Sequence, residues 1–393
     1  MKLKSQARLA VIGLGGMGSV HVKSILENEN TELAAICDLD HERVDQLGKD
    51  YKVKTFYDHK DLLLWGDFDG ILIATPHYTH TTIAIDAFKK GFHILTEKPV
   101  GVHANDISRM ISAWEKAKIH KPEIQFAAMF QQRTQGHWKK IKELIDSGEL
   151  GKLVRTSWII TDWFRTQHYY DHGDWRATWK GEGGGVLLNQ CPHQLDLYQW
   201  FVGMPSVVNG FAGIGKYHNI EVEDEVTGYF QYENGMVGHF LTSTGESPGT
   251  NRLEIVGEMG KIVFEKDVLT FYRNRISMLD QIDAATGGFD QCENWEINIP
   301  YPKINESGHR IIIENFADAI LSGKELIAPA PEGIHSVSLG NAIMLSHFEG
   351  KSVSFPLDGD LYESVLNKLI ENSTFQKNRV EKAAKAADLS SSY

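Results

Sequence analysis

Lys98 is the first residue whose type and position point to chemistry. It lies between Glu97 and Pro99, directly after a short apolar run that ends at Leu95. Proline disfavours helical geometry in the residue before it, so the backbone at Lys98 is expected to stay extended. A partly desolvated ammonium at a strand end can hydrogen-bond a reacting hydroxyl and stabilise the developing alkoxide. The alternative is an ordinary solvated loop lysine.

The second chemical group is a histidine that follows a run of three glycines. Residues 183–185 permit close approach of the backbone to a ligand, and Asn189 and His193 follow, four residues apart. That spacing places both side chains on one face of a helical turn, and Pro192 suits the first turn of a helix. Histidine is the natural general base near neutral pH, although a lone helix histidine is more often structural. Lys98 and His193 together predict a proton-transfer pair.

A glycine-rich turn near the N-terminus predicts a dinucleotide site. It fits G-x-G-x-x-G between an apolar run and a helix-compatible segment: Gly13, Leu14, Gly15, Gly16, Met17, Gly18. The glycines allow the tight turn, the approach of a pyrophosphate and the packing of the helix, whose start faces the phosphates. Asp38 lies 20 residues beyond Gly18, where a carboxylate accepts both ribose hydroxyls and repels a 2′-phosphate. NAD is therefore predicted over NADP, against the alternative of a structural turn and a helix-capping aspartate.

Four further positions are expected to line the cofactor. Thr75 and Pro76 follow a later apolar run, where the chain passes under the nicotinamide half. Pro76 would equally start a helix, and His80 would equally be a surface residue of that helix. Glu97 is placed to neutralise Lys98 or to contact the nicotinamide ribose.

The elements that must position these groups alternate in the first 130 residues. Five short apolar runs are each followed by a turn or a helix-compatible segment: 9–12, 33–37, 71–74, 93–95 and 125–130. Buried runs alternating with helices indicate a parallel sheet with right-handed crossovers, which binds ligands at the carboxyl ends of its strands. An NAD-binding Rossmann domain is therefore predicted over 1–130.

Beyond residue 153 the pattern becomes the alternation typical of half-buried strands, as in 154–159, 226–232 and 252–257. Asn234-Gly235 predicts a hairpin turn between two such strands. We expect a substrate-binding and oligomerisation α/β domain over 131–375, with a large, mostly antiparallel, open-faced sheet. Helices are expected near 312–321 and 336–347, and residues 376–393 predict a polar C-terminal tail.

The composition excludes several classes of function. The 393 residues carry a net charge of −12, which gives nucleic-acid binding no electrostatic basis. The three cysteines lie far apart, in neither metal-ligand nor disulfide-scaffold spacing, so no metal site is expected. No apolar run approaches the roughly 18 residues of a membrane helix, and the N-terminus lacks the features of a signal peptide. A cytoplasmic protein of two domains is expected.

Together the motifs resemble the glucose–fructose oxidoreductase / inositol dehydrogenase / MocA (Gfo/Idh/MocA) family of nicotinamide-dependent sugar oxidoreductases. The resemblance extends to about Pro356 and is carried by 13–18, Asp38, Thr75-Pro76, Glu97–Pro99 and the segment from Gly183 to Asp196. It implies that Lys98 and His193 are the catalytic pair and that the protein forms a homodimer or homotetramer. Many members have an aspartate where this chain has Asn189. An amide cannot act as a base, so Asn189 is expected to hydrogen-bond a sugar hydroxyl while Lys98 and His193 carry the proton transfer.

Aromatic and polar residues between 163 and 179 predict a carbohydrate pocket, because sugars present apolar faces and hydroxyl edges. Arg176 is expected to hold the nicotinamide amide or a substrate hydroxyl, Trp175 to stack on a pyranose, and Tyr169 to line the same pocket. The alternative for this segment is a hairpin at a subunit interface. Arg133 is expected to border the cleft or, equally, to form a structural salt bridge.

These expectations combine into NAD-dependent oxidation of a secondary alcohol on a sugar, glycoside or cyclitol, with C3 of a glucoside-like pyranose as the preferred position. His193 takes the hydroxyl proton and Lys98 stabilises the alkoxide. The alternatives are NAD-dependent glycoside cleavage by transient oxidation and elimination, and a regulator that binds dinucleotide without turnover. A regulator has no need for a proton-transfer pair, which argues against it.

Overall fold

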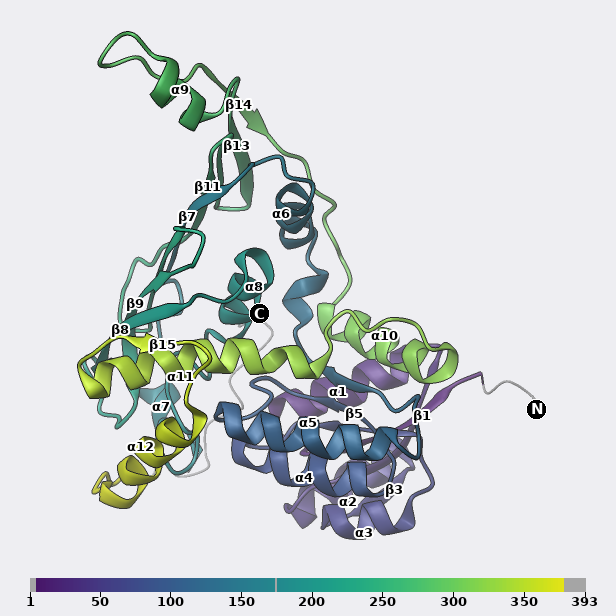
Figure 1. The fold of residues 1–393 in the computed structure, drawn as a ribbon. Helices are drawn as coiled ribbons and strands as arrows, with labels where there is room; N and C mark the ends of the chain where they lie inside the picture. Colours follow the sequence, from purple (N-terminus) through teal and green to yellow (C-terminus); the bar gives the residue numbers. More distant parts are fainter. Residues whose placement is uncertain (1–4, 174, 378–393) are drawn as a thin grey trace.

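The computed structural model describes residues 5–173 and 175–377, which form two sheets with helices between and around them (Figure 1). The predicted tail, 376–393, lies outside the described residues except for its first two positions. None of the described helices is long and apolar enough to cross a membrane. The described residues also contain no group of three or more acidic, histidine or cysteine side chains arranged to hold a metal.

The first sheet is parallel throughout and six-stranded, with the order β3-β2-β1-β4-β5-β6. Its strands are β1 (Ala7–Ile12), β2 (Thr31–Cys37), β3 (Lys54–Phe56), β4 (Gly70–Ile73), β5 (His93–Thr96) and β6 (Phe126–Ala128). The connecting helices are α1 (Gly16–Glu27), α2 (His41–Tyr51), α3 (His59–Trp65), α4 (His77–Lys89) and α5 (Ala104–Lys118). This confirms the predicted Rossmann sheet. The strand order reverses between β1 and β4, where sheets of this kind open a crevice for ligands.

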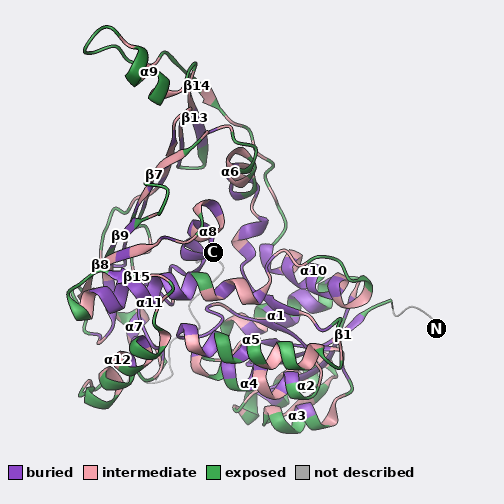
Figure 2. Ribbon diagram, in the orientation of Figure 1, coloured by how far each residue is buried: buried purple, intermediate pink, exposed green. Residues whose placement is uncertain are grey.

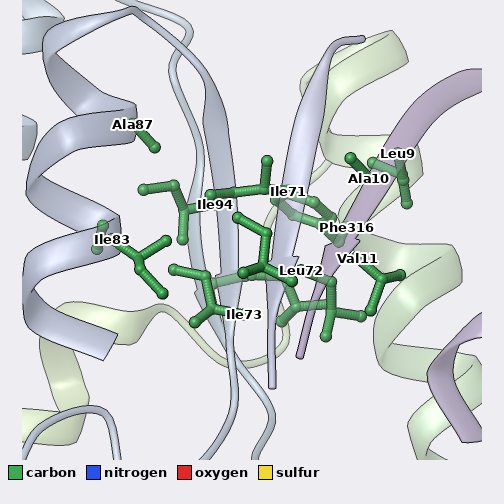
Figure 3. Close-up of a cluster of buried hydrophobic side chains, with 14 of the residues drawn as sticks. Leu9, Ala10, Val11, Ile71, Leu72, Ile73, Ile83, Ala87, Ile94 and Phe316 are labelled. Carbon is green, nitrogen blue, oxygen red and sulfur yellow. The ribbon is translucent and has the colours of Figure 1, made fainter. Parts of the chain in front are cut away.

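The strands of this sheet are short apolar runs because both of their faces are covered. Figure 3 shows side chains of β1, β4 and β5 packed together, with Leu9, Ile71 and Ile94 fully buried. Phe316 joins them from α10 (Gly308–Ser322), which lies beside α1 in Figure 1. The core of the first sheet thus also includes α10, a helix that lies outside the range 1–130 expected for the Rossmann domain.

The second sheet has nine strands in the order β14-β13-β12-β11-β7-β10-β9-β8-β15, and only the β7–β10 pairing is parallel. This confirms the mostly antiparallel sheet. Its strands are β7 (Leu153–Ile160), β8 (Val207–Ile214), β9 (Glu223–Gln231), β10 (Val237–Ser243), β11 (Asn251–Gly257), β12 (Gly260–Glu265), β13 (Val268–Asn274), β14 (Asn294–Asn298) and β15 (Val353–Ser354). The expected hairpin joins β9 to β10, and Gly235 takes a positive φ of 85° there.

Helices cover one face of the second sheet and leave the other face bare (Figures 1 and 2). The remaining elements are η1 (Gln131–Thr134), α6 (Gly136–Asp146), α7 (Gln167–Asp171), α8 (Pro192–Val202), α9 (Met278–Ala284), η2 (Ala330–Glu332), α11 (Gly333–Glu349) and α12 (Gly359–Asn372). Alternate residues show the two faces: Trp158 and Val208 are buried under the helices, whereas Ile159 and Phe211 are 38% and 70% exposed. α11 packs against both α5 and β8 and so connects the two halves.

Candidate active site

A cavity of about 770 Å³ lies at the carboxyl ends of the first sheet and is closed on the other side by segments of the second domain. Most of the residues singled out in the sequence line it: Gly13, Gly15, Gly16, Met17, Asp38, Thr75, Pro76, Glu97, Lys98, Tyr169, Trp175, Arg176, Asn189 and His193. Trp163 and Arg165 join them, so a large part of the aromatic segment faces the cavity. Leu14, Gly18, His80 and Arg133 were also singled out but do not line it.

The glycine turn has the geometry that a dinucleotide requires. Gly13 has a φ of 91°, and a Cβ there would lie 2.5 Å from the carbonyl oxygen of Ala74. A Cβ at Gly18 would lie 1.8 Å from the carbonyl oxygen of Gly13, so this position serves the packing of α1 against β1. Gly15 has nothing within 4 Å of its missing Cβ, which leaves the space that a pyrophosphate occupies at a helix start.

Asp38 is held at the end of β2 by two backbone donors. Its Oδ2 accepts from the amide of Leu14 at 2.6 Å, and its Oδ1 accepts from the amide of Asp40 at 2.9 Å. Arg43 on α2 lines the same end of the cavity, with Nη1 3.7 Å from Asp38 Oδ2. The sequence interpretation overlooked Arg43, although a cation in the first turns of the helix after Asp38 was a readable signal. Together these residues fit the adenosine half of a dinucleotide.

His80 lies behind the cavity wall and not on it. The ring is fully buried, with Nε2 2.8 Å from the carbonyl oxygen of Thr75 and Nδ1 2.9 Å from that of Pro99. The first turn of α4 thereby joins the loop after β4 to the loop after β5. We assign His80 to holding these two cofactor-lining loops together.

Glu97 is a buried carboxylate whose partner is a histidine on α1. His21 Nε2 lies 2.6 Å from Glu97 Oε1, and Glu97 Oε2 accepts from the amide of Lys98 at 3.0 Å. Burial alone would raise the pKa of Glu97, but the hydrogen bond and charge of His21 outweigh it and bring the pKa to about 2. Glu97 is therefore ionised. His21, which the sequence interpretation missed, lies one turn beyond the glycine loop.

The Lys98 side chain reaches the turn before α8, where Nζ donates to the backbone oxygen of Asn189 at 3.1 Å. Burial lowers the pKa of Lys98, and the negative charge of Glu97 opposes part of that shift. A lysine with a depressed pKa exchanges its proton more readily than a solvated one. The strand-end position expected from the sequence is thus a desolvated position in contact with the second domain.

His193 lies in the first turn of α8 with its side chain buried. Burial and the nearby charge of Lys98 lower its pKa well below the usual value, so the ring is neutral at physiological pH and can accept a proton. Its Nε2 lies 3.1 Å from Nε2 of Gln131, in η1. α8 begins only at Pro192, so Asn189 and His193 do not share a helix as the spacing suggested; Asn189 lies in the preceding turn, and both still line the cavity.

Arg133 is held away from the cleft by two carboxylates. Its Nε and Nη2 donate to Asp196 at 2.7 and 2.6 Å, and Nη1 donates to Glu332 at 2.5 Å. The side chains of Arg133 and Asp196 are 2% and 1% exposed. η1 turns the Arg133 side chain toward α8, and its guanidinium nitrogens are occupied by the two carboxylates. The structure therefore corrects the expectation of a substrate contact in favour of the salt-bridge alternative.

The aromatic segment places a stacked cation at the cavity edge. The Arg176 guanidinium lies 4.4 Å from the ring centre of Tyr169 and 4.9 Å from that of Trp175, and it also donates to the Tyr169 hydroxyl. Glu182 is buried directly beside this group and hydrogen-bonds the side chain of Asn189. The sequence interpretation did not select Glu182.

Comparisons with known proteins agree with this arrangement. A family model described as "Oxidoreductase family, NAD-binding Rossmann fold" matches residues 7–120. A model described as "GFO/IDH/MocA C-terminal domain" matches residues 138–263. These two stretches together make up more than half of the chain.

Relatives and solved structures cover different shares of the chain. The rhizopine catabolism protein MocA of Rhizobium meliloti is 31% identical over 50% of this chain and 57% of its own length. A myo-inositol 2-dehydrogenase of Thermotoga maritima is 26% identical over 65% of this chain and 74% of its own. The fold is also that of the WlbA dehydrogenase of Bordetella pertussis, solved with NADH and UDP-GlcNAcA (TM-score 0.75, 24% identity, 90% of this chain and 100% of that one). A levoglucosan dehydrogenase solved with NADH has the same fold (TM-score 0.74, 21% identity, covering 90% of this chain and 100% of that one). The chain thus belongs to the Gfo/Idh/MocA family of oxidoreductases, with an NAD-binding Rossmann domain.

Proposed function

We propose that this protein oxidises a secondary alcohol of a sugar, glycoside or cyclitol with NAD, with C3 of a glucoside-like pyranose as the preferred position. The observation that carries the proposal is the single cavity that joins the dinucleotide turn to Lys98 and His193. Names of relatives support a polyol substrate, since they include an inositol dehydrogenase and a levoglucosan dehydrogenase.

His193 and Lys98 act on the reacting hydroxyl in different ways. When bound, the nicotinamide supplies the hydride acceptor for the carbinol hydrogen. Neutral His193 takes the hydroxyl proton, and the Lys98 ammonium hydrogen-bonds the same oxygen while negative charge develops on it, so the alcohol becomes a ketone. The ionised Glu97 next to Lys98 favours the ammonium form that this role requires.

The substrate side of the cavity supplies an apolar surface and hydrogen-bonding groups. Trp175 offers a ring face for a pyranose, and Arg176 and Tyr169 offer hydrogen bonds to hydroxyls. Asn189 offers an amide between these groups and Lys98. We assign substrate contacts to these four residues.

The bare face of the second sheet supports assembly into a homodimer or homotetramer. Ile159 of β7 and Phe211 of β8 lie in register across the sheet and expose apolar surface on the side opposite the helices. Light scattering of the purified chain tests this: a monomer at micromolar concentration contradicts it.

Turnover of a panel of sugars, glycosides and cyclitols with NAD tests the proposed reaction, with NADH absorbance as the readout. Lys98→Ala and His193→Ala are each expected to lower turnover by about 100- to 10,000-fold while NADH binding persists, because each removes a proton-transfer or charge-stabilising group. Lys118→Ala and His120→Ala, which do not line the cavity, serve as matched controls. Glycosidic cleavage without net NADH would support the elimination alternative, and NADH binding without any turnover would support a regulator.

A further inference from the structure

Glu182 is a buried acid behind the substrate end of the cavity, in contact with the lining residue Asn189, and the reaction described above does not use it. The residue is 1% exposed and lies in the turn before the glycine run. Oε2 accepts from the amide of Ala177 at 2.6 Å, and Oε1 accepts from Nδ2 of Asn189. Burial raises the pKa of Glu182, while the charge of Arg176 and these two donors favour the ionised form.

The hydrogen bonds around Glu182 run in one direction. A carboxylate only accepts, so it fixes the NH₂ end of the Asn189 amide toward itself and turns Oδ1 the other way. Oδ1 lies 3.4 Å from the hydroxyl of Tyr169. That hydroxyl accepts from Arg176 and, at 3.2 Å, from Nε2 of Gln190, which leaves its own hydrogen for Asn189. The chain of donors therefore leads from the Arg176 cation to the Glu182 anion.

The orientation of Asn189 matters because the same residue also contacts the catalytic lysine. Lys98 Nζ donates to the backbone oxygen of Asn189, and Glu182 is one of the negative charges that act on the lysine. Asn189 thus contacts Lys98 through its backbone oxygen and Tyr169 through Oδ1, and the residue lines the cavity. A reversed amide would place Nδ2, a donor, at the position that Oδ1 now holds.

We propose that Glu182 is a positioning residue that fixes Asn189 as a hydrogen-bond acceptor for the substrate. This proposal rests on the proposed function and narrows its substrate class to vicinal diols. The reacting hydroxyl meets Lys98 and His193, and the hydroxyl on the neighbouring carbon donates to Asn189 Oδ1. A substrate without that neighbouring hydroxyl leaves Asn189 Oδ1 with only the 3.4 Å hydrogen bond from Tyr169 and reacts more slowly.

An exchange of the two side-chain types tests the proposal. In Glu182→Gln two amide side chains face each other, and in Asn189→Asp two carboxylates do. The double variant Glu182→Gln/Asn189→Asp again pairs one amide with one carboxylate, and residue 189 still offers an acceptor. Each single variant is expected to lower kcat/KM for a vicinal diol by about 10- to 100-fold, the range for a hydrogen bond to a charged group. The double variant is expected to recover most of that loss. Glu221→Gln is the matched control, because Glu221 accepts from the Trp179 amide of the same segment without touching Asn189.

Thermal unfolding of the wild type and of these variants provides a readout that does not depend on turnover. Single variants are expected to melt below the wild type and the double variant above both singles. An unchanged kcat/KM and melting temperature in Glu182→Gln, or a double variant no better than the singles in both measurements, overturns the proposal. If the wild type turns over no polyol, the proposed reaction fails, and the unfolding cycle still decides whether Glu182 positions Asn189. If a diol and its deoxy analogue react equally in the wild type, the diol assignment fails.

Discussion

Replacing Asp38 by serine is expected to reverse the cofactor preference. The carboxylate follows β2, with Arg43 Nη1 3.7 Å away, and it lines the cavity beside the glycine turn, where we expect the adenosine ribose. Serine is too short to reach both ribose hydroxyls and carries no charge. The substitution removes the repulsion of a 2′-phosphate and leaves Arg43 as the nearest charge.

The magnitude follows from two effects. Loss of one hydrogen bond between a hydroxyl and a carboxylate costs about 1.5–3 kcal/mol, which raises the Kd for NADH about 10- to 100-fold. Two unit charges about 4 Å apart interact by about 1 kcal/mol in water and about 4 kcal/mol near a protein surface, so NADPH gains about 5-fold or more. The ratio of the two Kd values is therefore expected to shift by about 50-fold or more in favour of NADPH.

Equilibrium titration of NADH and NADPH by fluorescence measures this ratio without a known substrate. Asp38→Ser/Arg43→Ala is the informative companion: it should keep the weakened NADH binding and lose the gain in NADPH binding. The gain should also shrink with added salt, because the phosphate contact is ionic. An NADH-to-NADPH ratio in Asp38→Ser equal to that of the wild type would refute the assignment of Asp38.

Two further predictions concern charges around the site. Arg133→Leu leaves the carboxylate of Asp196 buried without its partner. The variant is expected to lower the free energy of unfolding in urea by about 3–5 kcal/mol. Its affinity for NADH should be unchanged at urea concentrations below the unfolding transition. A normal urea midpoint with an altered substrate KM would instead support a substrate contact. His218 lies 2.9 Å from both Asp224 Oδ2 and the Arg165 carbonyl oxygen; burial lowers its pKa, but these acceptors outweigh burial and raise it. The stabilisation of the fold by protonated His218 is thus fully present below the unfolded-state pKa of about 6.5, and it is lost as the pH rises through the raised pKa of the folded state. His218→Gln should therefore destabilise the protein more at about pH 6 than at about pH 9. Equal destabilisation at both pH values would contradict this.

Much of the fold was predictable because its signals are local. The runs that became β1, β2, β4 and β5 are mostly apolar, and the alternating runs of the second sheet show burial at about every other residue. The contribution of α10 to the first core was not predictable. Its apolar residues specify a helix, whereas its placement against α1, β1 and β5 depends on contacts across most of the chain.

The candidate site likewise contains residues that the sequence predicts and residues that it does not. Gly13, Asp38 and Lys98 were selected because each ends or follows a strand, where backbone geometry fixes their location. Glu182 gave no such signal, because it lies in an irregular turn whose path back toward Asn189 depends on tertiary packing. Arg133 also comes after a strand, but it lies within η1, and a side chain of that length takes its direction from the nearest buried carboxylates.

The return of α10 to the first sheet has a consequence for synthesis of the chain. Until residues 308–322 have emerged from the ribosome, β1 and β5 lack one of the helices that cover them, and the buried cluster that includes Leu9 and Ile71 lacks Phe316. The N-terminal half therefore cannot complete its folding ahead of the rest, as N-terminal domains generally do during translation. A nascent chain stalled at residue 130 is expected to recruit chaperones that bind apolar surface, and one stalled well beyond residue 322 is not.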